Sequence, residues 1–510
     1  MALHPLPLRQ GHSAGFLTLG SSLYDTLCGL KAASAVFTKL DVSYSASEPL
    51  ATPVIVNLPD NGLRLRFDGA DQRLRLIEIV DFHKMRLTFK NEDVISGLNN
   101  TTSRSTSPLL YRRVYQLFGP SYPGEYIPPS DGGNIGVYIL SFPGIALSFP
   151  LQASAWSPKV DHATMLSSSA SPATSISIFE GKSWPEARKE LFTRNPSLPR
   201  SSCLTSRPKD VGPDEIEHIR VFGAGRLELL RRSSPTLSIV LSQTTPQDLI
   251  TELGPPSIIY KRSSDQATDD LRSTMRPSRR SSLAPRNSYK SSYKSSYETE
   301  PSSISSTNTD TFETDFDDDD MDGAEAANAE AQYYCYFEHG FDILVGPPTE
   351  VSPLPTAVQA LGDGAAIVRP TSSTGSRLTA TRIVLHGNIP GSYPFNRHRR
   401  SRWSLAHVTG PKQEAITSES KFSDFHSSLI QAYRDIWPEK DMKDGMVIVR
   451  SWGEDSPSGS AILIGGEMDE MEEDLDKNGE QWLGNTRLYK FPGLMFEVMH
   501  NGAVSALTVY

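Results

Sequence analysis

Cysteine and long apolar segments are scarce in this 510-residue chain. Its three cysteines, Cys28, Cys203 and Cys335, are far apart and show none of the paired spacings of disulfide frameworks or cysteine metal sites. The most apolar run, from Val137 to Leu151, is shorter than a membrane span and is interrupted by proline and glycine. The N-terminal residues lack the apolar stretch of a signal peptide. These absences predict a cytoplasmic protein with no signal peptide and no transmembrane segment.

An excess of basic charge is also missing. The chain has 60 acidic and 50 basic residues, so its formal net charge is -10. Nucleic-acid-binding proteins carry clustered positive charge that displaces counterions from phosphates, and this balance therefore argues against such a function. Apolar residues make up only 37% of the chain, so part of it is expected to stay outside any packed core. Protein partners are the expectation for a chain of this kind.

Serine-rich, low-complexity sequence separates the expected folded regions. The clearest such segment covers residues 262–331, and its basic first half is followed by an acidic second half that includes Asp317 to Asp320. A segment of this composition cannot bury enough apolar surface to fold. The predicted organisation is an N-terminal α+β region, an irregular linker, a middle α+β region, a disordered insertion and a C-terminal α+β region with two irregular loops. These are residues 1–153, 154–177, 178–261, 262–331 and 332–510, with the loops at 350–376 and 453–481.

A helix followed by a β-hairpin recurs along the expected folded regions. Periodic apolar residues predict four helices, within residues 17–30, 109–124, 244–256 and 421–438. Alternating residues after each helix predict paired strands, clearest in FPGLMFEVMHNGAVSALTVY from Phe491, where Asn-Gly is a strong hairpin signal. The predicted fold class is therefore α+β, with repeated helix and antiparallel hairpin units, helices packed on one face of the sheets, and long disordered insertions. Chance alternation in an ordinary α+β domain is the alternative explanation.

The sequence shows no convincing catalytic constellation. GHSAG at 11–15 matches the pattern of a serine nucleophile elbow, but too few residues precede it for the sheet that such an elbow requires. FGAGR, with Gly223 and Gly225, lacks the third glycine of a dinucleotide loop and is more typical of a turn between strands. The eleven histidines show no metal-ligand spacing, and His398 lies beside four arginines that disfavour a metal cation. We therefore expect no enzyme, with no catalytic, cofactor-binding or metal-ligating residues.

One basic cluster stands out among the expected ordered residues. It lies in NRHRRSRW and consists of Arg397, Arg399, Arg400, Arg402 and Trp403. On the surface, such a cluster would meet acidic lipid headgroups or an acidic partner. An ordinary solvated face is the alternative.

A phosphorylation motif lies in the long insertion. In RRSSL, Arg279 and Arg280 precede Ser281 and Ser282 at a spacing that basophilic kinases accept. A phosphate there would partly neutralise the basic half of the insertion.

Several segments, taken together and in order, resemble the phagosome-assembly-factor family of eukaryotic proteins. They are NGLRLRFDGADQRLRLIEIVD from Asn61, ELGPPSIIYKRS from Glu252, YYCYFEHGFDILVGP from Tyr333, RIVLHGNIPGSYPFNRH from Arg382 and the C-terminal segment from Phe491. The long insertions depart from the compact form of the family, and no site residue is carried over from it.

The resemblance implies a non-enzymatic scaffold that acts in autophagosome formation. It would join the phagophore assembly site with a WD-repeat β-propeller partner, and that partner would read phosphoinositide membranes, so lipid contact would be indirect. The alternative is a peripheral trafficking factor at the trans-Golgi network, in Golgi-to-plasma-membrane transport, which binds lipid directly through the basic cluster. The oligomeric state is not predicted.

Overall fold

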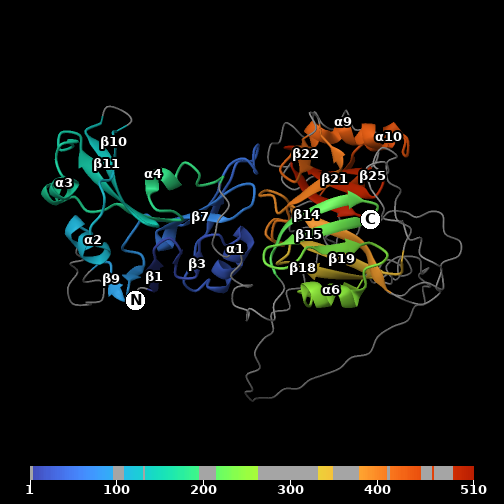
Figure 1. The fold of residues 1–510 in the computed structure, drawn as a ribbon, viewed down its shortest axis with the longest axis horizontal. Coiled ribbons are helices and arrows are strands. Elements are labelled where there is room, and N and C mark those ends of the chain that lie inside the picture. The colour runs from blue at the N-terminus through green and yellow to red at the C-terminus, as the bar shows by residue number, and fades with distance from the viewer. Residues whose placement is uncertain are drawn as a thin grey trace, which may run out of the picture.

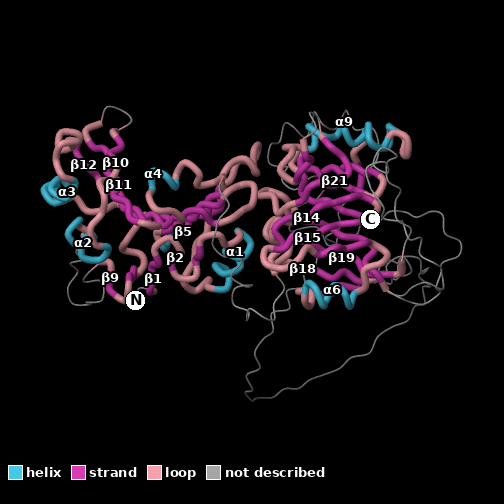
Figure 2. The backbone as a smooth tube through the Cα atoms, viewed as in Figure 1, coloured by secondary structure: helices cyan, strands magenta, loops and turns pink. Residues whose placement is uncertain are grey.

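The chain forms two sheet-rich halves that lie side by side in the computed structural model (Figures 1 and 2). The described residues are 4–95, 108–129, 133–193, 214–261, 331–348, 378–410, 414–449, 462–464 and 486–510. Ser281, Ser282, nearly all of the 262–331 insertion, all of 350–376 and most of 453–481 lie outside them. No helix in the described part of the chain is long and apolar enough to cross a membrane.

The first half contains a five-stranded and an eight-stranded sheet. Its elements are β1 (Pro5–Arg9), β2 (Ser13–Ala14), β3 (Leu17–Thr18), α1 (Leu23–Ala32), β4 (Asp41–Ser43), β5 (Val54–Leu58), the 3₁₀ turn η1 (Pro59–Asn61), β6 (Leu63–Phe67), β7 (Leu74–Ile79), β8 (Arg86–Phe89), β9 (Glu92–Asp93), α2 (Tyr111–Phe118), β10 (Glu125–Ile127), β11 (Ile135–Phe142), β12 (Ile145–Gln152), α3 (His162–Ser169), β13 (Ser175–Phe179) and α4 (Trp184–Ala187). The strand orders are β3-β2-β1-β8-β9 and β10-β11-β12-β13-β7-β6-β5-β4. Only β1 and β8 pair in parallel among these described strands.

The second half contains a five-stranded and a nine-stranded sheet. Its elements are β14 (Ile216–Gly223), β15 (Arg226–Arg231), β16 (Leu237–Val240), α6 (Pro246–Leu253), β17 (Ile258–Lys261), β18 (Gln332–Tyr336), β19 (Phe341–Gly346), β20 (Thr379–His386), β21 (Trp403–Thr409), β22 (Ala415–Thr417), α9 (Phe422–Tyr433), α10 (Glu439–Lys443), β23 (Met446–Val449), β24 (Ile462–Ile464), β25 (Thr486–Phe491), β26 (Leu494–Met499) and β27 (Val504–Val509). The strand orders are β16-β15-β14-β21-β22 and β17-β18-β19-β20-β27-β26-β25-β23-β24. β14 and β21 form a parallel pair.

The two halves share one topology. In the small sheets, β3-β2-β1-β8-β9 corresponds strand by strand to β16-β15-β14-β21-β22, and the parallel pair falls at the same place in both. In the large sheets, β4-β5-β6-β7-β13-β12-β11-β10 corresponds to β17-β18-β19-β20-β27-β26-β25-β23, and β24 is an added strand at the end. The structure is therefore an internal duplication of one unit.

A repeated Phe-Pro-Gly turn extends this correspondence to single hydrogen bonds. The turn joins β11 to β12 at 142–144 and β25 to β26 at 491–493. The amide of Phe179 donates to the glycine carbonyl of the first turn at 3.2 Å, and the amide of Tyr510 donates to that of the second at 3.1 Å. Phe179 and Tyr510 thus occupy equivalent positions at the ends of β13 and β27.

Each half buries its own apolar core, and helix caps fix the equivalent first helices. One cluster of buried side chains joins the sheets and helices of the first half, and a second cluster does so in the second half. Ser22 caps α1 by accepting the Asp25 amide at 3.0 Å, and Thr245 caps α6 by accepting the Asp248 amide at 3.2 Å. Such caps satisfy amides that the first turn of a helix leaves unpaired.

The α+β class is confirmed, with sheets dominating the described residues, but the repeated helix-plus-hairpin unit is not. The unit that recurs is larger, because each of the two halves contains two of the four expected helices, α1 and α2 in the first half and α6 and α9 in the second. The helices are not confined to one face. Trp184 and Ala187 of α4 pack with Leu76, Ala146 and Phe179 in a small cluster apart from the main core of the first half.

The structure also divides the chain differently from the expected regions. Residues 154–177 include α3 and the start of β13, so they are not simply a linker. Residues 178–261 do not form a middle region, because β13 completes the large sheet of the first half and residues from 216 onward begin the second half.

Candidate functional site at the junction of the two halves

The connection between β20 and β21, residues 387–402, carries several of the contacts between the halves. Glu215, immediately before β14, lies between two arginines in this region. Its Oε1 atom is 2.6 Å from Nη2 of Arg73, in the first half, and 2.6 Å from Nη2 of Arg399, in the connection. All three side chains are at most 5% exposed. Charges removed from water in this way are stable only when they are paired, so the contact specifies one fit between the halves.

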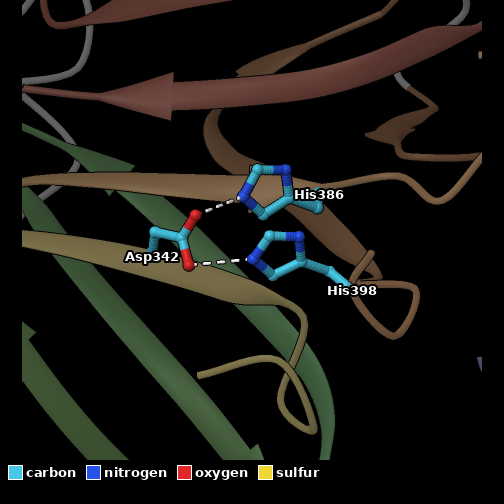
Figure 3. Close-up of side chains that lie close together, drawn as sticks. All are labelled: Asp342, His386 and His398. Atoms are coloured by element: carbon cyan, nitrogen blue, oxygen red, sulfur yellow. Dashed lines mark hydrogen bonds and ion pairs between the residues drawn. The ribbon is translucent and has the colours of Figure 1, made fainter. Parts of the chain in front are cut away.

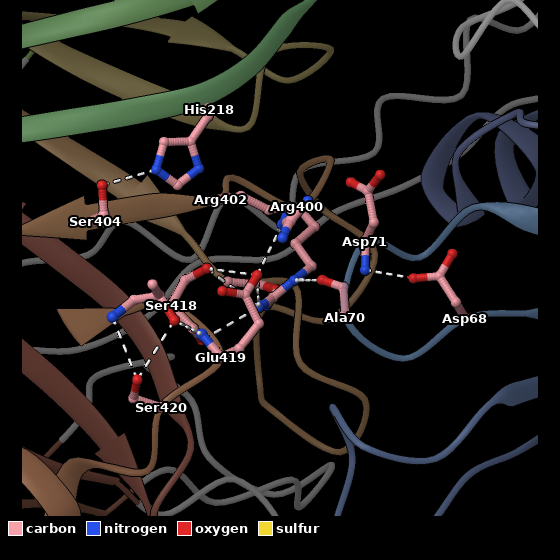
Figure 4. Close-up of polar contacts among 12 residues, drawn as sticks. Asp68, Ala70, Asp71, His218, Arg400, Arg402, Ser404, Ser418, Glu419 and Ser420 are labelled. Carbon is pink, nitrogen blue, oxygen red and sulfur yellow. Dashed lines mark hydrogen bonds and ion pairs between the residues drawn. The ribbon is translucent and has the colours of Figure 1, made fainter. Parts of the chain in front are cut away.

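Arg400 joins the halves through backbone carbonyls. Its Nε donates to the carbonyl of Ala70 in the first half at 2.6 Å, and Nη1 donates to the carbonyl of Gly387 at 2.6 Å. Nη2 donates to the carbonyl of Ser418 at 3.2 Å and lies 3.8 Å from Glu419 (Figure 4). A buried guanidinium with this set of acceptors acts as a clamp between the two halves.

Gln72 and Asn388 form a reciprocal pair across the same junction. The Gln72 side-chain amide donates to the Asn388 carbonyl at 2.7 Å, and the Asn388 side-chain amide donates to Oε1 of Gln72 at 2.9 Å. Both residues have a positive φ, 53° for Gln72 and 48° for Asn388. Such backbone angles are costly for residues other than glycine and persist where surrounding contacts enforce them.

The predicted basic surface cluster is not formed. Arg399, Arg400 and Trp403 are buried, and Arg397 and Arg402 are half-buried. Nε of Arg402 donates to Oε1 of Glu419 at 2.7 Å. Arg399, Arg400 and Arg402 face protein carboxylates and carbonyls, so the cluster does not form an exposed lipid-binding patch.

Burial and pairing act in opposite directions on the charges of the junction. Burial lowers the pKa of the Arg399 and Arg400 guanidinium groups, against the pull of Glu215 and Glu419. Burial would raise the pKa of Glu419, but Arg400 and Arg402 outweigh it and hold that pKa below its usual value. Arginine keeps its charge in proteins, so the junction is held by ion pairs.

In the second half, Asp342 of β19 lies between two histidines. Its Oδ2 atom is 2.9 Å from Nε2 of His386, and Oδ1 is 2.9 Å from Nε2 of His398 (Figure 3). The two imidazole rings stack with their centroids 3.8 Å apart. Asp342 comes from β19, His386 from the end of β20 and His398 from the 387–402 connection.

At the far end of the first half, three apolar side chains are exposed at a sheet edge. Ile127 of β10 and Val137 of β11 are directly opposite each other, and Ile135 of β11 is 60% exposed. β10 ends the eight-stranded sheet. We call Ile127, Ile135 and Val137 the β10–β11 patch.

Other residues singled out from the sequence have structural roles. Ser13 of GHSAG is buried in β2, in a turn-rich hairpin rather than at the top of a central sheet. Gly223 and Gly225 have positive φ angles and form the turn between β14 and β15, as the sequence predicts.

Sequence reasoning missed Glu215, Gln72, Asn388 and the Asp342 cluster. A weak signal for the cluster exists, because Asp342 interrupts the apolar run FDILV and His386 ends the run RIVLH. For the junction residues no local signal exists, since their partners lie in the other half of the chain.

Comparison with known proteins identifies the family. The family model described as phagosome assembly factor 1 matches residues 13–287 and 374–510. A PHAF1 protein of Drosophila melanogaster is 20% identical over 519 aligned residues, which cover 98% of this chain and 92% of that protein.

Two further relatives align over shorter segments. A PHAF1 protein of Arabidopsis thaliana is 30% identical over 144 residues, 28% of this chain and 32% of that protein. One of Caenorhabditis elegans is 30% identical over 132 residues, 26% of this chain and 28% of that protein. This chain therefore spans less than a third of the plant and nematode relatives. No solved structure matches the chain. Since the family model covers most of both halves and the connection between them, the chain belongs to the phagosome assembly factor 1 family.

Proposed function

We propose that this protein is a non-enzymatic scaffold in autophagosome assembly, which binds a WD-repeat β-propeller protein at phosphoinositide-containing membranes. Membership of the phagosome assembly factor 1 family supports the process. The structural observation that carries the scaffold role is the β10–β11 patch, because exposed apolar side chains at an open sheet edge are suited to docking a protein.

The comparison between the halves supports docking at this edge. In the second half, the strand equivalent to β10 is β23, and β24 pairs with its outer side. In the first half, β10 has no such neighbour among the described strands. The fold therefore accepts one more strand at this position, and an extended segment of the partner with alternating apolar residues fits there by strand addition.

Membrane contact is assigned to the partner rather than to this chain. Arg399, Arg400 and Trp403 are engaged inside the junction. Direct lipid binding through the basic cluster, on which the trafficking alternative relied, therefore loses its structural basis. Recruitment through a phosphoinositide-reading propeller needs only a protein-binding surface on the scaffold.

Affinity purification from growing and starved cells, with mass spectrometry of the recovered proteins, tests the proposal. The wild-type chain is expected to recover a stoichiometric WD-repeat protein and to form puncta on starvation. Ile135→Thr with Val137→Thr keeps the β-branched shape but removes apolar surface, and it is expected to lose the partner. Val80→Thr, at an exposed position outside the patch, is the matched control.

Two outcomes would contradict the proposal in distinguishable ways. Full recovery of the partner by the double variant would place the docking surface elsewhere on the chain. Recovery of the wild-type chain alone, in both growing and starved cells, would remove the scaffold role itself.

A further inference from the structure

We infer that Asp342, His386 and His398 form a binding site for a divalent transition-metal ion, with zinc the best match. The inference concerns a different part of the molecule from the β10–β11 patch and does not depend on the proposed function. Two imidazoles and one carboxylate are donors that zinc commonly takes from proteins.

The donor atoms already converge. One ligand atom from each of the three side chains lies within 4.8 Å of the other two. Each histidine Nε2 is 2.9 Å from a carboxylate oxygen of Asp342. Tetrahedral zinc with metal–ligand bonds of about 2.1 Å holds its ligand atoms roughly 3.4 Å apart. The two stacked rings point their Nε2 atoms at separate oxygens of Asp342, so an ion fits between these atoms once the cluster opens by a few tenths of an ångström and one ring turns toward the other.

The charge of Asp342 distinguishes it from other buried carboxylates of the molecule. Asp68 pairs with Arg75, Glu215 with Arg73 and Arg399, and Glu419 with Arg400 and Arg402. Within the described residues, the ion pairs of Asp342 are with histidines alone, His386 and His398. Two stacked rings 3.8 Å apart cannot both carry a positive charge without strong repulsion. The two rings therefore supply at most one positive charge beside Asp342, whereas a bound divalent cation supplies two.

His398 is prepared to act as a ligand. Its Nδ1 is buried and has no hydrogen-bond partner among the described residues. When an ion takes the place of the hydrogen bond between Nε2 and Asp342, the ring proton moves to Nδ1 and no other hydrogen bond of the ring is broken.

The arginines beside His398 in the sequence do not oppose the site. Arg399 turns toward Glu215 and Arg400 toward Ala70 of the first half. Arg397 lies over the ring of Tyr393 at 5.8 Å. The four arginines are neighbours of His398 in the sequence, which is why a metal site was not expected there. In the folded protein, the arginines named here make their contacts with other groups.

The first half lacks the equivalent ligands. The amide of Val80 donates to the Gly62 carbonyl at 2.8 Å, just as the amide of His386 donates to the Gly340 carbonyl at 2.9 Å. Val80 of the first half is therefore the equivalent of His386 in the second half. The same alignment of the two hairpins makes Arg64 the equivalent of Asp342. The metal site therefore belongs to the second half alone.

Cys335 supports the site without binding the ion. It lies directly opposite Asp342 on β18, and its thiol is hydrogen-bonded to that carboxylate. Its thiol is not among the donor atoms that lie within 4.8 Å of one another, so it orients the carboxylate rather than binding the ion.

The ion would fasten the junction connection to the sheet. Asp342 and His386 are on neighbouring strands, and His398 precedes Arg399 and Arg400 in the 387–402 connection. Holding His398 against β19 and β20 fixes Arg400, which contacts Ala70 of the first half, and Arg399, which shares Glu215 with Arg73 of the first half. Metal binding and the stability of the junction are therefore coupled.

The test is a metal titration of the full-length protein after treatment with a chelator. We expect one equivalent of Zn²⁺ to bind tightly, and one equivalent of Co²⁺ to give the visible absorption bands of a tetrahedral site. A thiolate-to-cobalt charge-transfer band is not expected, because Cys335 is not a ligand. Hydrogen exchange in residues 387–402 is expected to slow when zinc is bound.

Variants of the ligands give the decisive comparison. Asp342→Asn and His398→Gln are close in shape and are each expected to weaken zinc binding by at least about 100-fold. His426→Gln is the matched control, since the Nε2 of His426 contacts the Met442 carbonyl outside the cluster.

Three results would overturn the inference. They are a wild-type protein that binds no zinc or cobalt at micromolar concentration, folded ligand variants that retain wild-type affinity, and a charge-transfer band that assigns a thiolate ligand. If a variant does not fold, the cobalt spectrum and the zinc-dependent exchange of the wild-type protein decide the question without it.

Discussion

The same connection differs sharply between the two halves of the duplication. In the first half, residues 80–85 join β7 to β8; in the second, residues 387–402 join β20 to β21. Both connections cross over the glycine of a preceding hairpin, Gly62 in the first half and Gly340 in the second. The short form only closes the fold, whereas the long form holds both halves together and carries His398.

The opposite end of each large sheet shows the reverse difference. In the second half β24 covers β23, while in the first half β10 is the last of the described strands, and exposed apolar side chains lie on it and on β11. Duplication thus preserves the core and leaves connections and edges free to diverge. The second half carries the long connection that contacts the first half. The first half carries the β10–β11 patch, where we propose that the partner binds.

Removing the carboxylate of Glu215 is expected to have the largest effect. Glu215→Ala leaves Arg73 and Arg399 buried with their shared partner gone, so we expect a loss of about 3–5 kcal/mol in the free energy of unfolding. Urea denaturation measures it. Arg220→Ala, at an exposed position on the adjoining strand, is the control and should change stability by less than about 0.5 kcal/mol. Similar small losses in both variants would show that the junction contributes little to stability.

Lowering the pH should destabilise the protein through His398, which lies in the long connection and has no counterpart in the short one. The folded pKa of His398 is about 4, below its usual value of about 6.5, in surroundings that include Asp342, His386 and Arg397. As pH falls below 6.5 the unfolded chain binds the proton first, so the contribution of this ring to stability is present above pH 6.5 and lost between 6.5 and 4.

The size of this acid effect is bounded by the pKa shift. In chelator, wild-type protein should lose up to about 3 kcal/mol more than His398→Gln between pH 7 and pH 4. Denaturant titrations at several pH values measure the difference. Parallel pH profiles for the two proteins would contradict the assignment.

Local sequence patterns predicted the elements well, for a physical reason. Helix α6 lies between Thr245 and Gly254, inside the expected range 244–256, and the C-terminal hairpin turns at Asn501 and Gly502. Caps, turns and apolar periodicity act over a few residues, so a single sequence displays them. The sequence does not show which of the neighbouring serines Ser21 and Ser22 caps α1, because the two are chemically equivalent; in the structure it is Ser22.

Contacts between distant residues explain what the sequence did not show. Arginine is almost never fully buried unless paired, so NRHRRSRW is typical of a surface. Arg400 is buried because it meets the carbonyl of Ala70, 330 residues away. The parallel pairing of β14 with β21 is the equivalent of the β1–β8 pair in the first half. It also joins segments that are far apart in the chain, so the sequence does not show it.

The hairpin glycines Gly62 and Gly340 test whether the connections of the two halves pack in equivalent ways. Gly62 has φ +66° and Gly340 has φ +84°, in the region that favours glycine. A Cβ at Gly62 would lie 2.6 Å from the Asp81 carbonyl oxygen, and one at Gly340 would meet the carbonyl oxygen of Arg399. Both Gly→Ala variants should lose about 1–3 kcal/mol, measured by denaturation. A large loss in one half and none in the other would mean that the two connections pack differently against their hairpins.

The β10–β11 patch should produce the smallest change in stability of all. Ile135→Thr with Val137→Thr replaces apolar atoms of side chains that are 60% and 38% exposed, so the free energy of unfolding should stay within about 0.5 kcal/mol of wild type. On β25 of the second half, Leu488 is buried with Ile448 and Met495 outside the main core, and Leu488→Ala should lose about 2–3 kcal/mol. The contrast, measured by urea denaturation, separates an open surface from a covered one. A destabilised patch variant would mean that these side chains hold the first half together, and their exposure would then no longer favour a partner.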